Sequence, residues 1–185
     1  MSTGAIVLIV AVIVVAAIVW MIYTRRKRTA HLKSTFGPEY DRAVAESSDR
    51  RRAEEILDRR QKRVQRYHLR ALRPEERERF AEAWRIEQER FVDGPRTAVA
   101  RADELVSDAM TARGYRIPDL RTRMEDLSVQ HPAEVEHFRA AHEIALRDAQ
   151  GQAGTEDLRQ SMQHYRAIFE TILDQKLNAR EEVRQ

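Results

Sequence analysis

The residues with the types and spacing for metal chemistry lie between positions 134 and 143. Glu134 and His137 form an E-x-x-H pair, which is half of what a di-iron carboxylate bundle needs. Such a bundle requires a second E-x-x-H pair and two further glutamates, and the sequence contains no second pair. The pair therefore predicts a histidine at the surface or at the edge of a core.

A second histidine motif, His142-Glu143, resembles the start of the H-E-x-x-H zinc motif. It does not complete that motif, because Leu146 and Arg147 follow it. His137 and His142 are five residues apart, which places them about 140° from each other around a helix. We therefore expect no metal and no cofactor at these histidines.

Motifs for nucleophilic or phosphate chemistry are also missing from the sequence. The chain has no cysteine, which excludes disulfides, thiolate metal sites and cysteine nucleophiles. It has no P-loop, G-x-G-x-x-G or G-x-S-x-G motif. The sequence therefore predicts a protein that is not an enzyme; an enzyme with an unfamiliar site is the weaker alternative.

Positive charge is concentrated in one part of the chain. Residues 25–73 hold 16 Lys and Arg against 7 Asp and Glu, whereas residues 74–185 hold 17 against 23. On one long helix, five arginines of the basic part would share a face that could meet phosphates: Arg52, Arg59, Arg63, Arg66 and Arg70. No interleaving of aromatic and basic residues supports nucleic acid as the partner. The alternatives are anionic lipid, a solvated face, or contact with the chain's own acidic part.

An unbroken apolar run covers residues 5–22 and carries no charge. At 1.5 Å per residue it reaches about 27–30 Å, roughly the thickness of the hydrocarbon core of a bilayer. Trp20 and Tyr23 stand at its C-terminal end, where amphipathic rings favour the membrane interface. The run predicts a transmembrane helix.

Basic residues fix the expected orientation of this helix. They all lie on its C-terminal side: Arg25, Arg26, Lys27, Arg28 and Lys33. Positively charged flanks remain cytoplasmic, so we expect the N-terminus outside the cell membrane and the soluble part in the cytoplasm. The alternative is a cleaved signal peptide, but residues 1–4 contain no basic side chain, and Ala16 and Ala17 lie inside the apolar run.

Glycine and proline divide the remaining sequence into helical segments. We expect helices over about 38–67, 74–91, 95–113, 119–127, 132–149 and 155–177, and no strands. The predicted fold class is all-α, with a transmembrane helix, a basic connecting helix and a bundle of about five short helices. The corresponding domains are an anchor (1–24), a basic juxtamembrane and connecting part (25–73), a helical soluble domain (74–177) and a polar tail (178–185).

Several stretches together resemble a group of bacterial proteins that have an N-terminal membrane segment and a small helical domain. They are FGPEYDRAV (36–44), ERERFAEAWRIEQERFVDGP (76–95), ADELVSDAM (102–110), RGY (113–115), DLSVQHP (126–132) and TEDLRQSMQHYRAIFE (155–170). The resemblance implies the anchored helical architecture and carries no activity or functional residue. We expect the lipid bilayer and another protein as partners, with a homo-oligomer left open.

Overall fold

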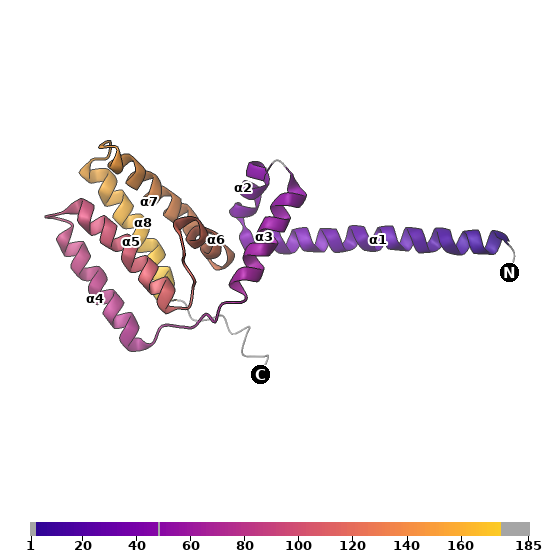
Figure 1. Cartoon of the computed structure of the whole chain (residues 1–185), viewed down its shortest axis with the longest axis horizontal. Helices are drawn as coiled ribbons and strands as arrows, with labels where there is room; N and C mark the ends of the chain where they lie inside the picture. The colour runs from indigo at the N-terminus through magenta and orange to yellow at the C-terminus, as the bar shows by residue number, and fades with distance from the viewer. Residues whose placement is uncertain (1–2, 48, 175–185) are drawn as a thin grey trace. The chain divides into compact units, whose positions relative to one another are not determined.

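The computed structural model describes residues 3–47 and 49–174, with side chains from residue 11 onward. Within these ranges the protein is helical and has no strand, which confirms the all-α prediction (Figure 1). The predicted polar tail lies outside the described residues. The helices are α1 (Thr3–Phe36), α2 (Pro38–Ser47), α3 (Arg50–Val64), α4 (Pro74–Arg90), α5 (Pro95–Ala112), α6 (Leu120–Gln130), α7 (Glu134–Ala149) and α8 (Thr155–Asp174).

Proline and polar residues set several helix ends. Pro74 and Pro95 occupy first-turn positions of α4 and α5, where a missing N–H costs nothing. The single helix expected over 38–67 is instead two helices, α2 and α3. The Ser47 hydroxyl donates to the Ala43 carbonyl oxygen at 2.7 Å, and Asp49 accepts from the Arg51 N–H at 3.0 Å. Such local bonds compete with the helical ladder, and they occur where no apolar side chain holds the helix.

The chain divides between Asp58 and Arg59 into two compact units. In the first unit, α1 ends at Phe36, and the positive φ of 49° at Gly37 allows α2 to turn back. The Glu54 carboxylate accepts hydrogen bonds from the Thr29 hydroxyl at 2.7 Å and from the Tyr40 hydroxyl at 2.9 Å. These bonds hold α3 against both α1 and α2. The unit's buried apolar side chains are Leu32, Phe36, Tyr40, Ala53 and Leu57.

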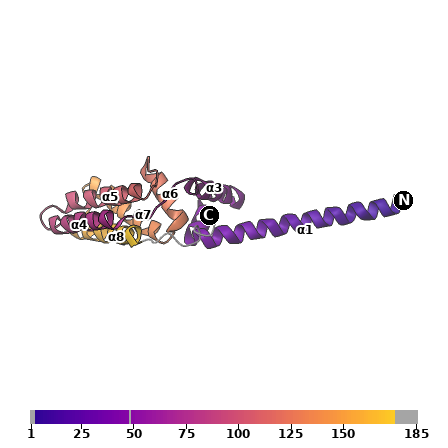
Figure 2. The ribbon, with the colours of Figure 1, turned by 90° about the horizontal axis from the view of Figure 1, so that it is seen from below.

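The second unit contains the five short helices α4–α8, which match the expected bundle. Helix α5 lies beside α4 and α8, and α7 lies beside α8 and α6 (Figures 1 and 2). Its core is aromatic at two points: Trp84 stacks on Phe169 at 4.7 Å, and Phe138 meets Tyr165 edge-on at 6.0 Å. In the sequence of α8, apolar residues recur at helical spacing, which predicts one apolar face, and this face is buried in the core: Leu158, Met162, Tyr165, Phe169, Ile172 and Leu173.

Of the residues that the structure describes, none belongs to a helix that is both long and apolar enough to pass through a membrane. Residues 5–10 of the predicted span lie outside the residues with described side chains.

Candidate functional site

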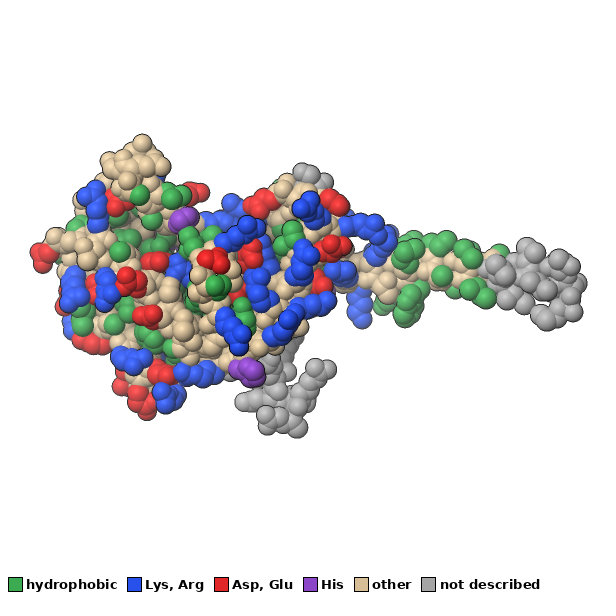
Figure 3. Space-filling model, in the orientation of Figure 1, with side chains coloured by type: hydrophobic (Ala, Val, Ile, Leu, Met, Phe, Trp, Pro, Cys, Tyr) green, Lys and Arg blue, Asp and Glu red, His purple; other side chains and the backbone are tan. Residues whose placement is uncertain are grey.

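Helix α1 carries an exposed apolar surface on all sides. From residue 12 to residue 23 every large hydrophobic side chain is between 45% and 69% exposed. In the second unit, by contrast, the described residues expose two large hydrophobic side chains, Val92 and Leu146. Hydrophobic side chains cover this part of α1 in Figure 3, whereas mixed charges cover the helical bundle. Exposed apolar surfaces of this extent are typical of segments that contact another protein or a membrane.

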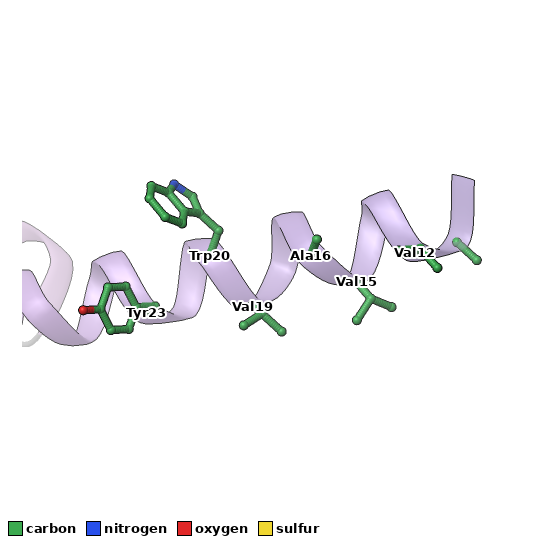
Figure 4. A pocket seen from close by; sticks show the side chains of 7 residues that line it. Val12, Val15, Ala16, Val19, Trp20 and Tyr23 are labelled. Carbon is green, nitrogen blue, oxygen red and sulfur yellow. The ribbon is translucent and has the colours of Figure 1, made fainter. Parts of the chain in front are cut away.

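One side of α1 forms a shallow apolar surface (Figure 4). All its residues come from a single helix, so it is the side of an exposed helix and not an enclosed cavity. Trp20 and Tyr23 stand at its C-terminal end, as the sequence places them. The lining residues are Ala11, Val12, Val15, Ala16, Val19, Trp20 and Tyr23.

The predicted basic residues follow on the same helix. Arg25, Arg26 and Lys27 are exposed, and within the described ranges no salt bridge is seen for them. Arg28 pairs with Asp58, with a nitrogen–oxygen distance of 3.5 Å. Lys33 pairs with Asp41 at 3.8 Å and also lies over the Tyr40 ring. We call Arg25, Arg26 and Lys27 the basic collar, because these three follow the apolar run directly and face solvent.

The five arginines predicted to share a helical face do not do so. Helix α3 ends at Val64, so Arg66 and Arg70 lie beyond it in an irregular segment. Arg63 donates to Asp126, with 2.7 Å between Nε and Oδ1, and Arg70 donates to Glu76. These two cations contact the chain's own acidic part, which was one of the alternatives. The remaining three, Arg52, Arg59 and Arg66, are exposed.

A buried carboxylate joins the irregular segment to α6. Asp126 is 1% exposed and accepts from the Tyr67 hydroxyl at 2.6 Å as well as from Arg63. Burial and this hydrogen bond raise the pKa of Tyr67 to about 12. Burial by itself raises the pKa of the neighbouring Glu125, but hydrogen bonds and charges from Arg63 and Arg60 outweigh it and lower that pKa.

Two further arginines are buried inside the bundle. Arg113 is fully buried and donates to the carbonyl oxygens of Ile172, at 3.0 Å, and Arg70, at 3.3 Å. Burial lowers its pKa. Arg123 pairs with Asp103 and lies over the Phe138 ring at 4.3 Å. Arg113 thus gives the Ile172 carbonyl oxygen, near the end of the described part of α8, a side-chain donor.

The histidine region contains one pair that the sequence did not reveal. His137 of α7 and His164 of α8 place their Nδ1 atoms 3.0 Å apart. Burial and the neighbouring His137 lower the pKa of His164. Glu134 accepts from the Thr171 hydroxyl at 3.3 Å. Among the described residues, no group of three or more His, Cys, Asp and Glu side chains is arranged to hold a metal.

No protein-family model, no curated protein and no solved structure matches this chain.

Proposed function

We propose that this chain is a single-pass membrane protein and that its helical bundle is a non-enzymatic protein-interaction module at the cytoplasmic face. The exposed apolar surface of α1, followed at once by the basic collar, carries the proposal. Residues 5–22 would lie in the hydrocarbon core, and Trp20 and Tyr23 at the headgroups.

The apolar surface is large enough to drive insertion. Burial of one Val, Ile or Met side chain contributes about 1.5–3 kcal/mol relative to exposure. Headgroup attraction adds about 1 kcal/mol per cation at the basic collar. The summed burial free energy of the apolar side chains on α1 exceeds this attraction. The apolar run therefore supplies the membrane affinity, and the collar sets the orientation.

Absence of cysteine provides a direct test of orientation. Two single-cysteine variants, Ser2→Cys and Val92→Cys, are exposed on intact cells to a maleimide that cannot cross membranes. Val92 is 83% exposed, so its cysteine reacts once the reagent reaches it. We expect labelling of Ser2→Cys on intact cells and of Val92→Cys only after permeabilisation. Labelling of Val92→Cys on intact cells, or extraction of the protein by alkaline carbonate, would refute the proposal.

A charge-matched pair of variants tests the collar. Replacing Arg25, Arg26 and Lys27 with Gln should make the orientation mixed, so that part of the Val92→Cys population reacts on intact cells. Replacing Arg50, Arg51 and Arg52 with Gln removes the same charge more than about 20 residues from the apolar run, where the orientation rule no longer acts. Equal effects of the two triple replacements would contradict a role for the collar.

The protein partner should be recognised mainly through polar groups. In the second unit the described residues expose Val92 and Leu146 as large hydrophobic side chains, which is too little for an apolar docking face. Cross-linking in native membranes, with capture of the full chain, should return one partner whose association weakens as salt rises. Recovery of no partner besides the chain itself would restrict the module to self-association.

Anionic lipid is the second candidate ligand, and the exposure of Arg25, Arg26 and Lys27 favours it. Nucleic acid is less favoured, because Arg63 and Arg70 contact carboxylates of the same chain. A salt titration with anionic vesicles and with duplex DNA, using the full chain in zwitterionic nanodiscs, distinguishes these ligands.

A further inference from the structure

His137 and His164 face each other across the contact between α7 and α8. Their ring centroids are 5.3 Å apart, and their Nδ1 atoms are 3.0 Å apart. Both side chains are partly exposed, so a dissolved ion can reach them. The Nδ1 atoms of the two rings lie within hydrogen-bond distance of each other, a contact that neither the sequence spacing nor the E-x-x-H pair indicated.

We propose that this histidine pair binds a divalent transition metal ion of the Cu²⁺ or Ni²⁺ type through both Nδ1 atoms. Neutral imidazole is a common ligand for such ions, at bond lengths of about 2.0–2.1 Å. Two bonds of that length from nitrogens 3.0 Å apart enclose an angle of about 91–97° at the metal. Tetragonal sites use angles near 90°, whereas a tetrahedral Zn²⁺ site requires about 109°. This angle is compatible with a tetragonal Cu²⁺ or Ni²⁺ site, and Cu²⁺ also binds nitrogen ligands most tightly among the divalent first-row ions.

The protein supplies two nitrogens, and water completes the coordination. No third His, Cys, Asp or Glu of the described residues is placed to join the pair. Glu134, one turn before His137, has its carboxylate at the Thr171 hydroxyl instead. Two ligands held at the right spacing still bind more tightly than one, because the second bond forms within the same molecule.

Metal binding needs no redox step and, at neutral pH, no loss of a proton. Without metal, one ring donates from Nδ1 and the other accepts. When both Nδ1 atoms bind the ion, the proton of the donor ring moves to its Nε2 atom. At acidic pH the metal must displace protons, so its affinity falls with pH.

Occupancy would join two helices through residues 27 positions apart. The unfolded chain does not hold the two rings at this distance, so the ion stabilises the folded bundle selectively. The pair would then make the stability of the bundle respond to metal concentration.

The test uses the full chain in detergent micelles, titrated separately with Cu²⁺, Ni²⁺ and Zn²⁺. Thermal melting gives stabilisation, and electron paramagnetic resonance of Cu²⁺ reports coordinated nitrogen. We expect one equivalent of Cu²⁺ to raise Tm, with the affinity order Cu²⁺, Ni²⁺, Zn²⁺, and two imidazole nitrogens on copper. His137→Gln and His164→Gln should each weaken Cu²⁺ binding by at least about tenfold, the lower end of losses measured for outer-shell groups. His142→Gln is the matched control on α7 and should change nothing.

Two results would overturn the proposal. One is that both Gln variants bind Cu²⁺ as tightly as His142→Gln, which would place the metal elsewhere. The other is preferential binding of Zn²⁺, which would contradict the expected order of affinities. Melting without metal shows whether each variant folds, and His164→Asp offers a second ligand type that should restore part of the affinity lost in His164→Gln.

Discussion

Replacing Asp126 with alanine tests whether the buried carboxylate holds the irregular segment on the bundle. Alanine leaves the Tyr67 hydroxyl and Arg63 without the acceptor that lies 2.6 Å and 2.7 Å from them. Removing one partner of a buried pair costs about 3–5 kcal/mol, but here only Asp126 is buried, since the Arg63 side chain is 37% exposed. Arg63 keeps its contact with Glu125 at 3.0 Å, so we expect a loss near the lower end, about 3 kcal/mol. Tyr67→Phe removes one hydrogen bond to a charged group and should cost about 1.5–3 kcal/mol.

Urea unfolding of the full chain in micelles, followed by far-ultraviolet circular dichroism, measures these free energies. Asp108→Ala is the matched control, because Asp108 is exposed on α5. The double variant Tyr67→Phe, Asp126→Ala should lose less than the two single losses combined, because both remove the same bond. Additive losses, or an Asp126→Ala loss no larger than that of Asp108→Ala, would show that the carboxylate does not hold the segment.

Three other predictions concern backbone strain and pH. Gly114 has φ 98°, and a Cβ there would lie 2.5 Å from the His68 carbonyl oxygen; Gly114→Ala should therefore lower Tm more than Gly151→Ala, where φ is 72° but space is open. Burial and the neighbouring His137 lower the pKa of His164, so as pH falls the unfolded chain takes up a proton on His164 at higher pH than the folded chain does. The free energy of unfolding should therefore fall as pH drops below 6.5, and it should fall less in His164→Gln. The pKa of Tyr67 is raised from 10.0 to about 12, so its contribution to the free energy of unfolding is complete below pH 10 and is lost as pH rises toward 12. Over that interval the free energy of unfolding of Tyr67→Phe should therefore fall less than that of the unchanged chain.

Helix starts were predictable from the sequence, because proline acts locally. Pro74 and Pro95 fix φ and lack an N–H, and both begin helices as expected. The break between Ser47 and Arg50 was not predicted, since it depends on side-chain bonds that compete with the helix and not on glycine or proline. Helical periodicity also identified the buried face of α8, because a single helix determines which of its residues share a side.

Most contacts between residues of the candidate sites could not be predicted from the sequence. The apolar run and the basic collar are continuous in sequence, so both could be found, and their membrane location stays a prediction. Tyr67 and Asp126 are 59 residues apart, and His137 and His164 are 27 apart. Periodicity tells which face of a helix is apolar but not which helix will cover it. The partners of buried polar groups therefore emerge only from the fold.

The cations of the basic part are not equally available to a ligand. Arg63 and Arg70 would have to give up charge-assisted hydrogen bonds to carboxylates of the same chain before meeting an external phosphate. Arg25, Arg26 and Lys27 are exposed and give up no such bond seen among the described residues. Attraction to anionic headgroups, about 1 kcal/mol per cation, should therefore be concentrated at the basic collar.

Trp20 offers a local probe of this concentration, since it lies one to two turns before the collar. With Trp84→Phe removing the second tryptophan, the full chain is placed in mixed bilayers in which either the anionic or the zwitterionic lipid is brominated. Brominated anionic lipid should quench Trp20 more than its bulk fraction predicts, and replacing the collar with Gln should abolish the excess. Replacing Arg63 and Arg70 with Gln should lower the stability of the bundle and leave the quenching unchanged. Loss of the excess in that second variant would show that the paired arginines are available to lipid after all.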